Sequence, residues 1–239
     1  TVALPAATSV AVSVDTDVIY HSSDPLVNLG MDTAAVLSVL LGYEDGSERD
    51  MEEDPRTVFT PSSNAITMSD NVAEASFVTS TVVAVNVSFG SYTALTDSVD
   101  ITIAKTVSLS LTSDAYPGCS ASECSGKVDI FPIVSTDGSF QRLEVSATAL
   151  DSSSNSFSID LDEDAEVVFN DTDVVAGVAT GACNSGSGGS CTVSDGSFSS
   201  GIVEGVGEGG ARIEVFWFNF SAAVDLEVHE TAVSVVDIA

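Results

Sequence analysis

The stretch Val83-Ala-Val-Asn-Val-Ser-Phe89 decides the fold class of this chain. Its large apolar residues stand at every second position, so in an extended strand they share one face, while Asn86 points to the other face. The same alternation recurs in residues 8–14, 99–103 and 107–112. Val, Ile, Thr and Phe fill these stretches, and Gly, Ser, Asn and Asp separate them, as is typical of strands and turns. We therefore expect an all-β protein.

Residues 31–41 form the one stretch whose periodicity fits either a helix or a strand. It continues into Gly42-Tyr-Glu-Asp-Gly46, where Asp-Gly is a dipeptide typical of tight hairpin turns. We interpret the stretch as a buried strand that leads into a hairpin. Many short strands at roughly ten-residue spacing favour a β-sandwich.

An internal repeat divides the chain. Residues 98–109 match residues 223–234, at an offset of 223 − 98 = 125 residues, and both segments end one strand and begin another at a Thr. The repeat predicts two tandem immunoglobulin-like β-sandwich domains, at residues 1–105 and 106–230. Residues 231–239 are then a surplus strand, or the start of a further repeat.

Three segments carry a resemblance to a known family. Residues 202–215, Ile-Val-Glu-Gly-Val-Gly-Glu-Gly-Gly-Ala-Arg-Ile-Glu-Val, resemble the closing hairpin of bacterial immunoglobulin-like group 2 repeats, and residues 170–178 resemble the segment before it. Residues 43–50 resemble the family's mid-domain Tyr-x-Asp-Gly turn, although the first repeat lacks the glycine hairpin. The resemblance implies an extracellular sandwich that serves as a spacer, adhesive or assembly module in surface proteins, and it implies no catalytic residues.

The charge of the chain excludes several partners. The 239 residues include 36 acidic and 6 basic side chains, which gives a formal charge of −30, yet 44% of the residues are hydrophobic. Such a chain is apolar enough to fold. Six basic side chains are too few to neutralise the phosphates of a nucleic acid, so nucleic-acid binding is excluded. Binding to an anionic membrane surface is disfavoured for the same reason. The sequence contains no run of 18 apolar residues, so we expect no transmembrane helix. We also expect that the first residues, Thr1-Val-Ala-Leu-Pro, do not form a signal peptide.

Cysteines and glycosylation sequons indicate a secreted protein. The cysteines lie in Gly- and Ser-rich segments at Cys119, Cys124, Cys183 and Cys191. Local disulfides, Cys119–Cys124 and Cys183–Cys191, are favoured, with cross-pairing and a zinc site as alternatives. Disulfides are typical of extracellular compartments. N-x-S/T sequons, which would carry N-glycans, start at Asn86, Asn170 and Asn219.

No motif announces an enzyme. The sequence has two histidines, His21 and His229, but no Gly-x-Ser-x-Gly motif that would supply a nucleophilic serine. We expect the glycines of residues 205–210 to form a turn between strands. We therefore expect no catalytic residue and no cofactor. Acidic clusters are the best ligand candidates, since calcium prefers carboxylate and carbonyl oxygens, and the alternative is a solvated acidic surface. The calcium candidates are Asp160, Asp162, Asp164, Asp171 and Asp173.

The surplus strand suggests how copies assemble. Either the chain is a slice of a longer repeat array, or one terminal strand completes a sandwich in a neighbouring copy. Residues 1–14 suit a donor strand, with Thr8, Val10, Val12 and Val14 at alternating positions. We expect a cell-surface filament or fibre whose subunits are joined to one another by strand donation. The alternative is a non-polymerising adhesin or stalk repeat that binds a receptor or glycan, with or without calcium.

Overall fold

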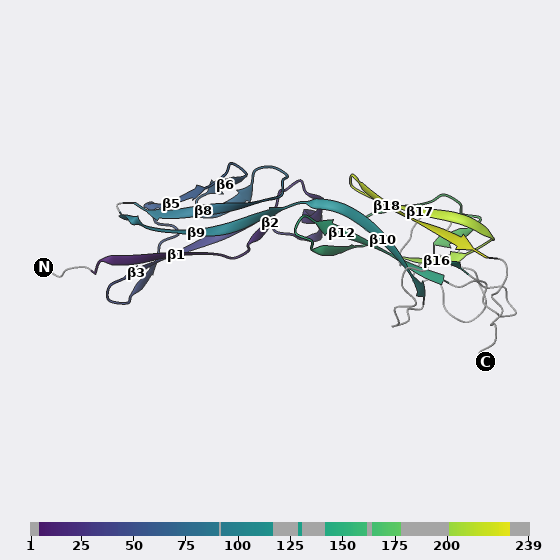
Figure 1. The fold of residues 1–239 in the computed structure, drawn as a ribbon, viewed down its shortest axis with the longest axis horizontal. Helices are drawn as coiled ribbons and strands as arrows, with labels where there is room; N and C mark the ends of the chain where they lie inside the picture. Colours follow the sequence, from purple (N-terminus) through teal and green to yellow (C-terminus); the bar gives the residue numbers. More distant parts are fainter. Residues whose placement is uncertain are drawn as a thin grey trace, which may run out of the picture. The chain divides into compact units, whose positions relative to one another are not determined.

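The computed structural model describes residues 5–90, 92–116, 129–130, 142–161, 164–177 and 201–229. These residues are almost entirely strands and their connections, which confirms the expected all-β fold class (Figure 1). Within them no helix has the length and apolar character needed to cross a bilayer. The chain divides into two compact units. The first comprises residues 1–106 and 151–154, and the second comprises residues 107–150 and 155–239.

The first unit is a sandwich of a five-stranded and a four-stranded sheet. In the five-stranded sheet the order is β1-β3-β7-β6, and β4 also pairs with β3. Its strands are β1 (Ala7–Val14), β3 (Ala34–Tyr43), β4 (Glu48–Asp50), β6 (Ile66–Ser69) and β7 (Val72–Ala75). In the four-stranded sheet the order is β2-β9-β8-β5, and β2 runs parallel to β9. Its strands are β2 (Val18–Tyr20), β5 (Thr57–Pro61), β8 (Thr81–Phe89) and β9 (Tyr92–Ala104).

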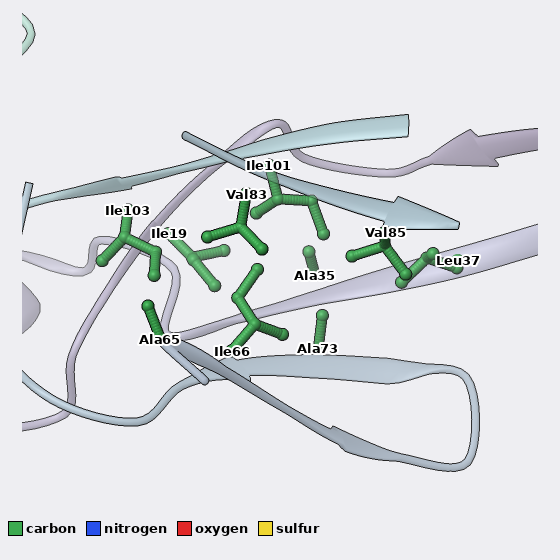
Figure 2. Packing of buried hydrophobic residues seen from close by; sticks show 10 residues of the cluster. All are labelled: Ile19, Ala35, Leu37, Ala65, Ile66, Ala73, Val83, Val85, Ile101 and Ile103. Atoms are coloured by element: carbon green, nitrogen blue, oxygen red, sulfur yellow. The ribbon is translucent and has the colours of Figure 1, made fainter. Parts of the chain in front are cut away.

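The core of the first unit lies between these two sheets. Figure 2 shows side chains of β8 and β9 meeting those of β3, β6 and β7 across the sandwich. On β8 the alternation expected from the sequence is confirmed, because Val83, Val85, Val87 and Phe89 are buried while Asn86 is exposed. The ten buried residues drawn are Ile19, Ala35, Leu37, Ala65, Ile66, Ala73, Val83, Val85, Ile101 and Ile103.

The ambiguous stretch at residues 31–41 is a strand, as expected. It forms most of β3, whose residues alternate between buried and exposed from Ala35 to Leu41. Strand β3 turns into β4 through the Asp-Gly turn, where Gly46 has φ +80° and Tyr43 N donates to Ser47 O at 2.9 Å. A glycine is needed here because other residues rarely adopt this left-handed backbone conformation.

The second unit repeats the strand order of the first. Its five-stranded sheet has the order β10-β12-β16-β15, with β13 also paired to β12, and its four-stranded sheet has the order β11-β18-β17-β14. Each strand corresponds to the one nine places earlier, including the parallel pair β11–β18. The strands are β10 (Thr106–Tyr116), β11 (Asp129–Ile130), β12 (Arg142–Asp151), β13 (Ser156–Ile159), β14 (Glu166–Phe169), β15 (Val175–Gly177), β16 (Ile202–Gly205), β17 (Gly209–Trp217) and β18 (Phe220–Val228).

The expectation of a closing hairpin at residues 202–215 is wrong. Strand β16 pairs with β12 and β15, whereas β17 pairs with β14 and β18, so the glycine-rich connection passes from one sheet of the sandwich to the other. The true hairpin is β17–β18. The hairpin was expected from the resemblance to the group 2 repeats, and a resemblance over one segment does not determine which strands pair.

A polar cluster surrounds the short 3₁₀ helix of the first unit. The short 3₁₀ helix Pro25–Leu29 is capped by Asp24, whose carboxylate accepts hydrogen bonds from Leu26 N at 3.1 Å and Thr106 N at 2.9 Å. The turn of residues 151–154 belongs to this unit, although it follows β12 in the sequence. Its Ser152 N donates to Lys105 O at 2.9 Å.

Candidate functional site

The strand expected to act as a donor lies at the edge of its own sheet. Strand β1 pairs antiparallel with β3, with Val12 opposite Val39 and Val14 opposite Leu37. The donor residues Val10, Val12 and Val14 are half-buried and pack against the core, whereas Thr8 is exposed. In this structure β1 therefore completes the sandwich of its own chain, and donation requires this strand to leave β3 and be replaced by the β1 of another copy.

A carboxylate from the opposite sheet holds the outer edge of β1. Val12 N donates to Asp97 Oδ2 at 2.9 Å, and Asp97 comes from β9. On β9 this residue has the same alternation phase as Leu95, Val99 and Ile101, so a charged group occupies a position on the inward face. Inward-pointing charges and satisfied edge groups are ways in which sheets avoid unwanted strand pairing. Asp97 thus links the two sheets and accepts a hydrogen bond from one backbone N–H at the edge of β1.

A second carboxylate fixes the end of β1. Asp15 Oδ1 accepts a hydrogen bond from Val36 N at 2.7 Å, and Asp15 N donates to Val36 O at 3.2 Å. Sequence reasoning missed both Asp15 and Asp97 as anchors of β1. The available signal was an acidic residue in phase with an apolar alternation, at Asp97 within Leu95-Thr-Asp-Ser-Val99.

Two neighbouring grooves in the first unit are acidic. The larger, of about 670 Å³, has an apolar part formed by Val58, Phe59 and Met68 beside carboxylates of Glu52, Glu53, Asp54 and Asp70. Arg56 forms an ion pair with Asp54 at 2.7 Å, and its side-chain hydrogen bond lowers the pKa of that carboxyl to about 2. Carboxylates thus line both grooves, and no histidine is among the lining residues.

The histidine expected to have no catalytic role makes a local contact. His21 Nδ1 lies 2.7 Å from Ser23 Oγ, and Ser23 N donates to the same ring nitrogen at 3.2 Å. Both contacts of this ring nitrogen lie within one exposed turn.

The calcium candidates do not gather into a ligand shell in the described residues. No group of three or more His, Cys, Asp or Glu side chains suited to a metal occurs there. Asp171 Oδ1 accepts from Asp173 N at 3.0 Å within one turn, and Asp164 N donates to Asp160 O at 3.0 Å. Asp162 lies outside the described residues, as do Cys119, Cys124, Cys183, Cys191 and the expected surplus strand at 231–239.

The three sequon asparagines differ in their surroundings. Asn86, on β8 between β5 and β9, donates from Nδ2 to Thr60 O at 3.4 Å. Asn170 Oδ1 accepts from Arg212 N at 2.5 Å, which holds this side chain against the backbone of β17. Asn219 is exposed in the two-residue turn between β17 and β18, and it makes no hydrogen bond with the part of the chain that the structure describes.

That same turn and the end of β17 present an exposed aromatic surface. In the aromatic run at residues 215–220, Trp217 faces the core, whereas Phe216 and Phe218 are exposed. Phe218 packs edge to face with Trp217, at a centroid distance of 5.5 Å. Alternation indicates that Phe216 faces solvent, but the turn position of Phe218 has no such signal in the sequence.

Comparisons with known proteins found similar solved structures but no family. No family model matches the chain, and no curated protein matches it. A crystal structure of the S-layer protein rSbsC(31-844) is similar over 96% of this chain and 29% of that chain, with a TM-score of 0.47 and 11% identity. Domains 4 and 5 of SbsC are similar over 93% of this chain and 98% of that chain, with a TM-score of 0.46 and 13% identity.

A third similar structure is the Yersinia pseudotuberculosis adhesin InvE, over 92% of this chain and 58% of that chain, with a TM-score of 0.28 and 10% identity. The chain thus spans less than a third of the longer SbsC fragment. These likenesses carry no activity, ligand or partner over to this chain, and the resemblance to the group 2 repeats stays a prediction.

Proposed function

We propose that this chain is a non-enzymatic extracellular structural module whose copies join into a filament or surface fibre by exchanging β1. One observation carries the proposal: among the strands that the structure describes, β1 is an edge strand that pairs with β3 alone. An edge strand can be replaced by an identical strand from another copy, which makes the same main-chain hydrogen bonds and places its side chains in the same positions.

The repeated strand order supports the proposal. In the second unit the equivalent position beside β12 is filled by β10, which starts at Thr106, two residues after β9 ends at Ala104. The sequence repeat predicts a third strand of this kind at residues 231–239. The first strand of a sandwich thus follows directly on the last strand of the preceding one, which is the connectivity of a tandem array.

The energetics favour exchange over simple charge attraction. A chain of charge −30 repels its copies, so contacts between copies must rest on backbone pairing and apolar burial. Three of the six basic residues are already paired with acids of their own chain, namely Arg56, Arg142 and Arg212. Because its valines are only half-buried, β1 loses less apolar burial on leaving than β3 would.

Sedimentation and negative-stain microscopy of the purified full chain test the proposal. We expect polymers from the full chain and soluble, less stable monomers after deletion of residues 1–14. Deletion of residues 1–5 is the matched control, because it leaves β1 whole. Fibres from the longer deletion would contradict strand exchange. A monodisperse full chain would favour the alternative, a non-polymerising adhesin or stalk repeat.

Cysteine trapping tests the exchange directly. Ser13 and Ser38 are exposed and lie opposite each other on β1 and β3. Chains carrying Ser13→Cys, mixed with chains carrying Ser38→Cys, should form a disulfide-linked heterodimer only if β1 of one copy pairs with β3 of another. A mixture of Ser13→Cys and Ser110→Cys chains is the control, and equal yields in the two mixtures would count against the proposal.

A further inference from the structure

The turn of the β17–β18 hairpin has an unusual backbone. Trp217 pairs with Phe220, so Phe218 and Asn219 form the two-residue turn. Phe218 has φ +52°, a conformation in which two-residue turns normally use Gly or Asn. A bulky residue with positive φ is uncommon, and it persists only where the surrounding structure holds it in place.

The ring of Phe218 is open to solvent. Its 62% exposure is the highest among the large apolar side chains that the structure describes, and Phe216 nearby is 39% exposed. The edge-to-face contact with the buried Trp217 restricts the ring. A ring that is held in place and left accessible is suited to pack against a ligand with an apolar face.

Asn219, beside this ring, begins the sequon Asn219-Phe220-Ser221. Asn219 and Ser221 are both exposed, so the amide and the hydroxyl are accessible together. The amides of the other two sequons, at Asn86 and Asn170, already make hydrogen bonds to neighbouring strands. Of the three acceptors, Asn219 is the one whose side chain needs no rearrangement.

We propose that Asn219 carries an N-linked glycan and that the first sugar of this glycan packs against the Phe218 ring. The inference rests on the extracellular location in the proposed function. In the transfer, Asn219 Nδ2 bonds to C1 of an N-acetylhexosamine and gives up one amide proton. The bond from C1 to the diphosphate of a lipid-linked glycosyl donor breaks, and the diphosphate leaves with the electron pair. The C–H face of the sugar then covers the aromatic ring.

Intact mass spectrometry of the full chain, secreted from an N-glycosylating host, tests the modification. The wild type should lose the mass of one glycan on Asn219→Gln, and also on Ser221→Ala, which keeps the asparagine but removes the hydroxyl of the sequon. Asn86→Gln and Asn170→Gln are the controls that should leave the Asn219 peptide glycosylated. A wild type without glycan on the Asn219 peptide would overturn the proposal.

Thermal unfolding before and after enzymatic removal of the glycan tests the packing. We expect a lower melting temperature after removal in the wild type, no such shift in Phe218→Ala, and an unchanged shift in the control Phe77→Ala, which alters another exposed ring. Mass spectrometry of each variant establishes that Asn219 is still modified. A shift that persists in Phe218→Ala would overturn the packing.

These outcomes separate the glycan from the filament. A glycosylated Asn219 on a monodisperse chain would support this inference and contradict strand exchange, and an unmodified Asn219 in polymers would do the reverse. If Asn219 is unmodified and Phe218→Ala dissolves polymers, the ring is a contact between copies and the glycan proposal is wrong.

Discussion

Tyr20 and Asp151 lie 131 residues apart in the sequence and share a buried hydrogen bond within the first unit, with Tyr20 Oη donating to Asp151 Oδ2 at 2.6 Å. The two residues are 3% and 2% exposed. Burying a carboxylate is costly unless donors surround it, and Ser153 N supplies another at 2.8 Å. The turn at residues 151–154 is therefore a structural part of the first unit.

We expect Tyr20→Phe to destabilise the protein by about 1.5–3 kcal/mol, because it removes a donor from a buried charged acceptor. Urea unfolding measures the change. Tyr116→Phe is the matched control, since Tyr116 is exposed and its replacement should change the stability by less than about 0.5 kcal/mol. Equal stabilities of the two variants would show that the Tyr20 hydroxyl contributes nothing.

The Asp54 carboxyl should titrate at unusually low pH. The side-chain hydrogen bond from Arg56 is the largest cause, and it lowers the pKa of Asp54 from 3.8 to about 2. A depressed pKa in the folded state stabilises the fold above pH 3.8, and this contribution is lost as the pH falls through about 2. Because the pair is exposed, the effect on stability is small, and NMR titration of the carboxyl is the suitable measurement.

Arg56→Gln should move that titration midpoint upward, toward the ordinary value. Arg49→Gln is the control, because Arg49 is the smallest of the causes that lower this pKa. A midpoint that responds more to Arg49→Gln than to Arg56→Gln would contradict the assignment.

The core between the two sheets of the first unit should be sensitive to truncation. Ile101 is fully buried on β9, so Ile101→Ala should cost about 2–5 kcal/mol through lost apolar burial and the remaining cavity. Val82→Ala, on the neighbouring strand but 59% exposed, should change the stability by less than about 0.5 kcal/mol. Chemical denaturation of both variants gives the comparison, and a similar loss in the two would place the core elsewhere.

Local alternation was sufficient to predict individual strands. On β8 the period-two pattern predicted both the strand and its buried face, because that face contacts the core. On β3 the periodicity was ambiguous, and the Asp-Gly turn that follows favoured the strand. The pattern was not sufficient for pairing. The resemblance to the group 2 repeats indicated a hairpin at residues 202–215, yet β16 and β17 lie in different sheets, because long-range contacts that a strand's own residues do not encode decide the pairing.

Polar anchors were predicted least well. Asp97 and Asp151 each bind a residue more than 80 positions away, so neither has a local signal for its partner. The sequons were visible in the sequence, but their hydrogen bonds and the exposed ring beside Asn219 follow from strand pairing and turn geometry. Sequence reasoning therefore identified the residue types of the candidate sites without the contacts that distinguish them.

Asp97→Ala should loosen β1 while leaving the rest of the first unit folded. It removes the acceptor of Val12 N, and local opening of an edge strand becomes easier when it loses a hydrogen bond. Hydrogen exchange measured by mass spectrometry should show faster exchange in residues 7–14 and little change in β8. Ser98→Ala, the next residue on β9 but exposed, is the control, and equal protection of β1 in the two variants would contradict a role for Asp97.

Two glycines with positive φ should differ in their tolerance of alanine. Gly201 has φ +66° and Gly46 has φ +80°, so alanine at either position is strained. A Cβ at Gly201 would also collide with the backbone oxygen of Val145, whereas a Cβ at Gly46 would meet no atom within 4 Å. Gly201→Ala should therefore destabilise the protein by about 1–3 kcal/mol more than Gly46→Ala, as is typical of overpacking. Urea unfolding of the two variants measures this difference. The hydrogen bond from Val145 N to Gly201 O, at 2.6 Å, places the two backbones close together. Equal losses of stability in the two variants would contradict this close spacing.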